Sequence, residues 1–251
     1  MGTIFKTYSA ILIFALCGLL LGNKCYCQKN GSGIRGKPEA VADAKAMVET
    51  MGGITLWAQL KSVHFVTEWY PCDRVDSYIE NEILDLTGPR SWADRKSEIN
   101  HILRVYSPEG KHWSIVNGKF SYASDDVLKE DMIRAPFNFY HLVKAIASGD
   151  PFYEVRFGTG DIPHTRRLEF YGPDGVMNGW VILNARKEPI VKGTAQYRYT
   201  LGPLKKFGNL YFPVWGVYDN GYTRYNLISA TGDNKDPDMS LFIPPAEYME
   251  N

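Results

Sequence analysis

Residues 63–70 read Val-His-Phe-Val-Thr-Glu-Trp-Tyr, and this order sets the first expectation about the fold. The alternate positions that share one side are Val63, Phe65, Thr67 and Trp69. Period-two alternation in a run rich in β-branched and aromatic residues is typical of a strand whose two faces meet different surroundings. The segment therefore predicts a strand in a β-rich protein.

Similar strand-like segments recur along the chain. They are residues 77–86, 91–100, 102–107, 112–116, 153–157, 166–171, 176–183, 194–201, 210–218 and 222–230. Turn-forming residues separate them at 108–110, 117–118, 173–175 and 220–221. Asn-Gly and Asp-Gly, which occur in three of these runs, accept the backbone angles of tight hairpin turns most readily. The pattern predicts a meander of antiparallel hairpins.

Two helical segments interrupt the meander. The first begins at Pro38, which suits a first helical turn, and stops at Gly52-Gly53. The second region runs from Ser124, a candidate N-cap, to Gly149 and is split by Pro136. Its later half carries one apolar stripe, formed by Phe139, Leu142, Val143 and Ile146. Such a helical pair can cover one face of a curved sheet, so we expect an α+β container with a lid.

The N-terminal residues 1–27 have the organisation of an export signal. Lys6 supplies the positive region, residues 10–21 form an uninterrupted apolar run, and Cys25 and Cys27 place small side chains before the expected cut. A membrane-spanning helix needs ~20 apolar residues, so an uncleaved anchor is the weaker alternative. No cysteine follows the apolar-small-small run of a lipoprotein signal. We expect a cleaved signal peptide and an exported protein.

Cleavage after Cys27 leaves Cys72 as the single cysteine of the mature chain. One cysteine cannot form an internal disulfide, so stability must come from a packed core. We expect residues 28–37 to form a flexible mature N-terminus and residues 38–251 to form one domain. Loss of Lys6 and Lys24 leaves 26 basic and 28 acidic residues, a net charge of −2, without a basic stripe. Nucleic acid is therefore not an expected partner.

A family resemblance rests on the opening of the predicted domain. The first helix ends in Met51-Gly52-Gly53, residues 56–63 read Leu-Trp-Ala-Gln-Leu-Lys-Ser-Val, and a late segment, residues 241–245, reads Leu-Phe-Ile-Pro-Pro. This order of elements resembles the bacterial periplasmic lipoprotein-carrier family, the LolA-like or outer-membrane lipoprotein-sorting proteins, over nearly the whole mature chain. The segments 150–163 and 232–238 have no counterpart in that family.

The resemblance implies an incomplete, strongly curved antiparallel β-barrel, a half-barrel, with an N-terminal helix and a mid-chain helical lid. Its concave apolar face would receive the acyl chains of a lipid or lipoprotein. It further implies a periplasmic location and a monomer that needs no cofactor, touches membranes only transiently, and can work with envelope protein partners. The family's inward arginine, which holds the lid closed, has four candidates by position: Arg74, Arg90, Arg95 and Arg104.

If the concave face contains a groove, we expect large side chains from the strands and the second helix to line it. They are Phe65, Trp69, Phe139, Leu142, Val143, Ile146, Trp180, Tyr197, Tyr199 and Trp215. The same residues would also suit an ordinary filled core. The alternative is therefore an envelope structural or interaction module with a filled core and a protein partner.

Catalytic motifs are weak. The five histidines are scattered, with no His-Glu-x-x-His run, and no Gly-x-Ser-x-Gly elbow occurs. Glu80 with Glu82 carries little signal in a chain of 28 acids. The best candidate for chemistry is the segment 158–167, which gathers glycines, Asp161, His164 and two arginines. We expect neither an enzyme nor a metal protein.

Overall fold

A computed structural model describes residues 33–107 and 112–249, all within the unit that begins at Ser32. The expected signal peptide and the expected turn at 108–110 lie outside these residues. The strands are β1 (Arg35–Gly36), β2 (Ser62–Tyr70), β3 (Tyr78–Asp85), β4 (Arg90–Lys96), β5 (His101–Tyr106), β6 (Trp113–Val116), β7 (Lys119–Tyr122), β8 (Glu154–Gly158), β9 (Arg166–Tyr171), β10 (Met177–Leu183), β11 (Pro189–Gly193), β12 (Arg198–Leu201), β13 (Leu204–Phe207), β14 (Leu210–Pro213), β15 (Trp215–Tyr218) and β16 (Arg224–Asp233). The helices are α2 (Pro38–Thr50), α3 (Ile54–Gln59), α4 (Asp125–Arg134) and α5 (Phe139–Ser148), with short 3-10 turns η1 (Ala135–Phe137), η2 (Met239–Phe242) and η3 (Ala246–Tyr248).

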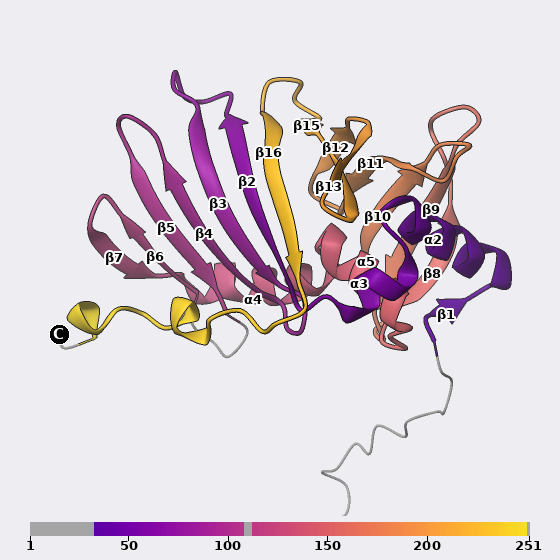
Figure 1. Cartoon of the computed structure of the whole chain (residues 1–251), viewed down its shortest axis with the longest axis horizontal. Helices are drawn as coiled ribbons and strands as arrows, with labels where there is room; N and C mark the ends of the chain where they lie inside the picture. The colour runs from indigo at the N-terminus through magenta and orange to yellow at the C-terminus, as the bar shows by residue number, and fades with distance from the viewer. Residues whose placement is uncertain (1–32, 108–111, 250–251) are drawn as a thin grey trace, which may run out of the picture. The chain divides into compact units, whose positions relative to one another are not determined.

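Fourteen strands form one curved sheet in the order β1-β8-β9-β10-β11-β12-β15-β16-β2-β3-β4-β5-β6-β7 (Figure 1). All neighbours are antiparallel except β1 and β8. In the described part of the chain the edge strands β1 and β7 do not pair with each other, so the sheet does not close. The expected α+β half-barrel fold is confirmed.

The register between β2 and β3 determines which side chains face the helices. Phe65 lies opposite Glu82, Thr67 opposite Glu80, and Trp69 opposite Tyr78. Opposed residues of an antiparallel pair project to the same face. The alternate residues Phe65, Thr67 and Trp69 and their partners on β3 therefore all project to the concave face of the sheet.

The main core lies between α2, α3, α5 and the β8–β10 side of the sheet. Met47 and Val48 of α2 and Val143 of α5 are fully buried there, together with Phe170 of β9. Trp57 fixes α3 against the end of α2, because its Nε1 donates a 3.0 Å hydrogen bond to the Met51 carbonyl. Burial of side chains of this size contributes about 1.5–3 kcal/mol each, so this half of the concave face is held by apolar packing.

The C-terminal segment covers the opposite, convex face of β4–β7. Phe242 packs with Val105 and Trp113 in a second hydrophobic cluster. Tyr248 stacks on Phe120 with a 5.2 Å separation between ring centroids. The late Leu-Phe-Ile-Pro-Pro run thus packs on the convex face of the sheet, away from the helices.

No helix of residues 33–107 and 112–249 has the length and apolarity needed to cross a membrane.

Several elements differ from the sequence-based expectation. The strands β1, β7, β11 and β13 lie outside all the expected strand segments, and β1 lies within residues 28–37, which were expected to be flexible. The segment 194–201 is not one strand, because Thr194–Tyr197 forms the turn of a hairpin between β11 and β12. The segment 210–218 is two strands, which belong to different sheets and separate after Pro213. Proline has no amide hydrogen and cannot continue a ladder on both sides. Helix α3 is too short to show a helical period in sequence.

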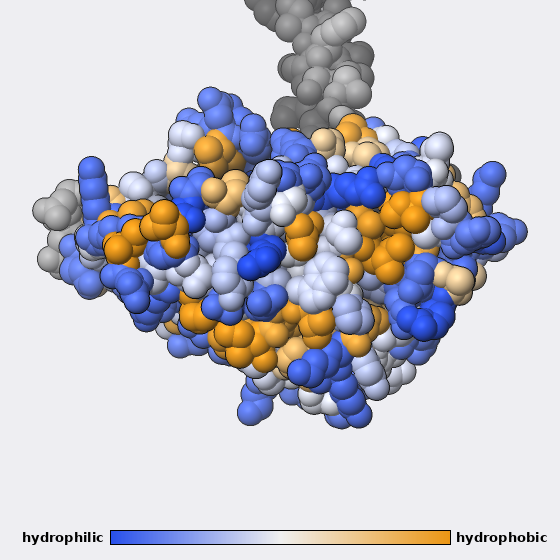
Figure 2. Space-filling view, turned by 90° about the horizontal axis from the view of Figure 1, so that it is seen from above, coloured by the Kyte–Doolittle hydropathy of each residue, from blue (hydrophilic) through white to orange (hydrophobic). Residues whose placement is uncertain are grey.

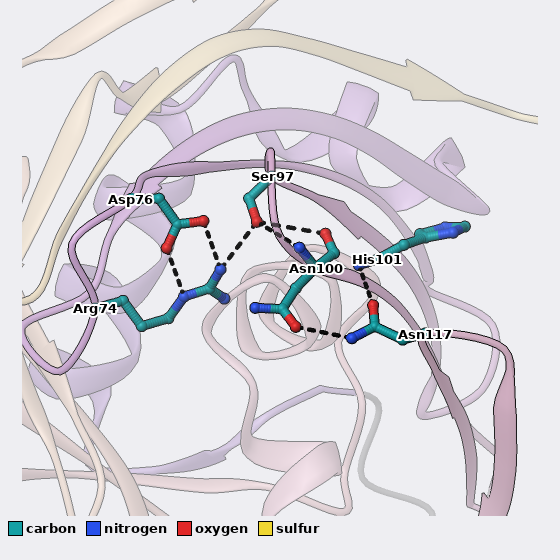
Figure 3. A network of polar contacts seen from close by, with 6 residues as sticks. All are labelled: Arg74, Asp76, Ser97, Asn100, His101 and Asn117. Carbon is teal, nitrogen blue, oxygen red and sulfur yellow. Dashed lines mark hydrogen bonds and ion pairs between the residues drawn. The ribbon is translucent and has the colours of Figure 1, made fainter.

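A polar network joins three loops at one end of the sheet (Figure 3). Arg74 in the β2–β3 loop donates to Asp76 at 2.8 Å and to the Ser97 hydroxyl in the β4–β5 loop at 3.0 Å. Asn117 in the β6–β7 loop donates to Asn100 Oδ1 at 3.0 Å. Hydrogen bonding of the Asp76 carboxylate to Arg74 first, and to Ser97 second, lowers the pKa of Asp76. These bonds keep neighbouring hairpins in register where the strands end.

Gly52 offers a direct test of the α2 ending. Its φ is +122°, and a Cβ there would lie 2.9 Å from the Asn209 carbonyl oxygen. Gly52→Ala should therefore combine backbone strain with a collision and lower the free energy of unfolding by about 2 kcal/mol or more in urea denaturation.

Gly118→Ala is the matched control. Gly118 also has positive φ, +83°, but a Cβ there would meet nothing within 4 Å. Its cost should be about 1 kcal/mol, from strain alone. Equal losses in the two variants would contradict the proposed close approach of α2's end to the β13–β14 hairpin.

Candidate functional site

A cavity of about 390 Å³ opens on the concave face, beside the packed core. Its aromatic lining consists of Phe65 and Trp69 of β2, Tyr140 of α5, Tyr197 before β12, Tyr199 of β12, Tyr218 of β15 and Tyr225 of β16. Its charged lining consists of Glu80 and Glu82 of β3 and Lys192 of β11. The volume lies within the ~300–1,000 Å³ range of small-molecule sites. The cavity is therefore large enough for a ligand and amphipathic.

Contacts between the rings hold the aromatic wall in place. Trp69 packs against Tyr225, with centroids 5.1 Å apart, and Tyr199 packs against Tyr218 at 5.3 Å. Trp69 Nε1 donates a 2.8 Å hydrogen bond to Glu80 Oε1, which fixes the indole orientation. Burial raises the pKa of Tyr199 to about 12 and that of Tyr225 further, so both hydroxyls stay protonated at neutral pH. The wall is thus preorganised and uncharged.

The charged groups of this cavity are unevenly paired. Arg95 forms an ion pair with Glu80. Burial, followed by the neighbouring Glu80, raises the pKa of Glu82 to about 7. Burial lowers the pKa of Lys192 to about 8, although the Glu82 carboxylate opposes the shift. Burial penalises the charged form of a group, so the pKa values of Glu82 and Lys192 both lie near pH 7 to 8 and far from their usual values.

Lys192 is surrounded by rings. Its Nζ lies 5.5 Å from the ring centroids of Phe139 and Tyr140 and 5.7 Å from that of Tyr199. These separations are within cation–π range and stabilise the charged ammonium in part. The lysine is held by aromatic faces at the boundary between core and cavity.

A second cavity of about 260 Å³ adjoins the first, and Glu82 and Tyr197 line both. It lies between β3–β5 and the α4–α5 connection, so the mid-chain helices cover this part of the concave face. Its lining includes four arginines, Arg90, Arg95, Arg104 and Arg134. Seen from the end that carries the β2–β3 and β15–β16 loops, hydrophobic and hydrophilic residues are interspersed (Figure 2).

Asp131 connects α4 to the sheet. Its Oδ2 lies 2.8 Å from His112 Nδ1 and 3.9 Å from Arg104, and its Oδ1 accepts a bond from Arg134. Burial alone would raise its pKa, but the bonds from His112 and Arg134 outweigh burial and lower the pKa to about 2. Asp131 therefore stays ionised. Among the four arginines considered from sequence, Arg104 is the one that reaches α4 through this carboxylate; Arg74 lies in the loop network.

The residues predicted to line a groove separate into three groups. Phe65, Trp69, Tyr197 and Tyr199 meet at the 390 Å³ cavity. Phe139, Leu142 and Trp180 line, with Tyr197, a void of about 10 Å³. Val143 and Ile146 are in the main core, and Trp215 is 37% exposed away from the cavity. The structure brings the strand residues together and packs the helical stripe into the core.

Several cavity residues were not anticipated. They are Glu80, Glu82, Tyr140, Lys192, Tyr218 and Tyr225. The two acids share the inward face with Phe65 and Thr67 through the β2–β3 register, so the alternation of residues 78–85 contained that signal. Lys192 lies on β11, in the interval between the expected strands 176–183 and 194–201, where the sequence analysis expected no strand.

The segment 158–167 does not contribute to either cavity. His164 is exposed with φ +58°, and Asp161 forms a 2.5 Å ion pair with Arg198. Within residues 33–107 and 112–249, no group of three or more His, Cys, Asp or Glu side chains is placed to hold a metal ion.

Comparisons with known proteins give structural likenesses at low identity. No protein-family model and no curated protein matches the chain. A DUF1329 family protein from Desulfovibrio piger is 9% identical, with a TM-score of 0.49, over 81% of this chain and 97% of that one. An uncharacterized conserved protein from Thermus thermophilus is 10% identical, with a TM-score of 0.37, over 83% and 94%. The Mycobacterium tuberculosis lipoprotein LppX is 12% identical, with a TM-score of 0.32, over 80% and 98%. At TM-scores below 0.5 these likenesses carry no inference about what this chain binds.

The raised pKa of Glu82 predicts a pH dependence of stability. The folded protein holds this proton up to about pH 7, against an unperturbed value of 4.5, so Glu82 makes the free energy of unfolding fall as pH rises between those values. Glu82→Gln should remove this slope, which is on the order of 1 kcal/mol per pH unit, in thermal or urea unfolding.

Glu98→Gln, in the exposed β4–β5 loop, is the matched control and should leave the slope intact. A lower free energy of unfolding for Glu82→Gln at pH 8 would mean that ionised Glu82 stabilises the fold as a partner of Lys192. The account in which burial disfavours the ionised carboxylate would then be wrong.

Proposed function

We propose that this protein is an exported, non-catalytic carrier that binds the acyl chain of a lipid or lipoprotein in the concave-face cavity. The observation that supports the proposal is the 390 Å³ cavity with its aromatic wall, next to a core that is otherwise closely packed. Aromatic faces can contact a flexible methylene chain of any length or conformation. Each methylene that leaves water contributes about 0.8 kcal/mol, so binding needs few directed hydrogen bonds.

The proposed setting is the bacterial envelope. An export signal over residues 1–27, cleaved after Cys27, would deliver the chain to the periplasm. Membrane contact would be transient, and donor and acceptor proteins would exchange the cargo. The proposed role in this setting is the transport of lipids or lipoproteins.

The packed part of the concave face supports a second candidate, an envelope interaction module with a filled core. Val143 and Ile146, which were expected to face cargo, are at most 1% exposed among core residues. The two candidates differ in whether the adjoining cavity takes up a ligand.

Leu227→Trp tests uptake directly. Leu227 is partly buried, lines the cavity and lies opposite Thr67, so an indole there should fill the space. The variant should weaken binding of dodecanol by about tenfold or more in isothermal titration calorimetry, equivalent to losing burial of about two methylenes.

The neighbouring residue supplies the control. Ile228 is 52% exposed on the same strand and does not line the cavity, so Ile228→Trp should bind as the parent does. A parent protein that folds but binds no dodecanol would contradict the proposed carrier function and favour the interaction module.

A further inference from the structure

Among the four arginines that line the second cavity, Arg104 is the one that the described residues neutralise least. Arg90 has Asp85 at 2.8 Å, Arg95 is paired with Glu80, and Arg134 with Asp131. Among residues 33–107 and 112–249, the nearest carboxylate to Arg104 is Asp131, at 3.9 Å, which is beyond hydrogen-bonding distance. Asp131 is already engaged by His112 and Arg134.

Like charges surround the same guanidinium. Burial comes first, and Arg95 and Arg134 follow, among the causes that lower the pKa of Arg104. Its Nε donates to His112 Nε2 at 3.2 Å, and the side chain remains 43% exposed at the cavity. Asp131 and Glu80 oppose this shift, and Arg95 and Arg134 are themselves ion-paired. The remaining N–H donors of Arg104 are accessible from the cavity.

The two cavities together have one positive charge in excess. When every acid, lysine and arginine is taken as ionised, the groups that remain beyond the three close arginine ion pairs are Arg104, with Asp131 only at 3.9 Å, and Lys192, against Glu82. Lys192 lies among rings, whereas Arg104 lies at the end of the joined cavities that is richest in cations. A single negative charge near Arg104 would balance this surplus.

We propose that the second cavity binds the anionic headgroup, a carboxylate or phosphate, of an amphiphile whose acyl chain occupies the aromatic cavity. This inference rests on the proposed function and adds the ligand's chemical class and orientation. Glu82 and Tyr197 line both cavities, so they lie at the proposed boundary between chain and headgroup. A guanidinium is suited to this role, because its planar donors match the oxygens of carboxylates and phosphates.

The test compares ligands with the same chain and different headgroups. Dodecanoate and dodecyl phosphate should bind the full mature chain about tenfold or more tightly than dodecanol at pH 8, the scale of one hydrogen bond to a charged group. Arg104→Gln should abolish this advantage while dodecanol affinity stays unchanged. Glu82→Gln should increase it, because a neighbouring negative charge is removed.

Arg156→Gln is the matched control. Arg156 is 48% exposed on β8 and paired with Glu154, away from both cavities, so its replacement should leave all affinities unchanged. Circular dichroism checks that each variant folds.

The outcomes separate the two proposals. Equal binding of dodecanoate and dodecanol by the parent protein, or an equal loss of both in Arg104→Gln, would overturn the headgroup site and leave the acyl-chain cavity standing. Failure of all three ligands would overturn the cavity's proposed function and the headgroup site with it. Inorganic phosphate or acetate binding as tightly as the amphiphiles would show a free-anion site and overturn the shared ligand.

Discussion

Packing of α5 against β2 and the β13–β14 hairpin divides the concave face into core and cavity. Phe65 lies 4.8 Å from Tyr140 and 5.3 Å from Phe212, measured between ring centroids, and Tyr140 lies 5.6 Å from Phe212. On one side of this aromatic contact the helices fill the face with apolar side chains. On the other side the inward strand residues line the two cavities, one of which lies beneath the α4–α5 connection.

The open half is amphipathic because its inward strand positions alternate in chemistry along the sheet. Glu80 and Glu82 face inward beside Phe65 and Trp69, and Arg95 and Arg104 follow on the next strands. Removing charges from water is costly unless they are paired and hydrogen-bonded. Glu82 and Lys192 respond with pKa values displaced toward neutrality, while Asp131 stays ionised among its donors. The resulting surface suits a ligand with both an apolar chain and a charge.

Sequence patterns predicted most of the strands of the sheet but not the composition of the site. Alternation in residues 63–70 identified the inward residues of β2, and Gly52-Gly53 marked the end of α2. The apolar stripe of α5 was visible in sequence, but a stripe has the same pattern whether it faces a ligand or α2 and α3. The charges of the cavity depend on strands that are distant in sequence, such as β3 and β11, and on which arginine each acid meets. Those are facts of register and packing that local patterns do not contain.

Native mass spectrometry of the protein purified from its native source, followed by organic extraction, tests the central claim most directly. The account predicts one acylated, negatively charged molecule bound per chain, released by extraction and taken up again by the emptied protein. A mass equal to the bare mature chain, with no uptake of added fatty acid or lipopeptide by folded protein, would contradict it.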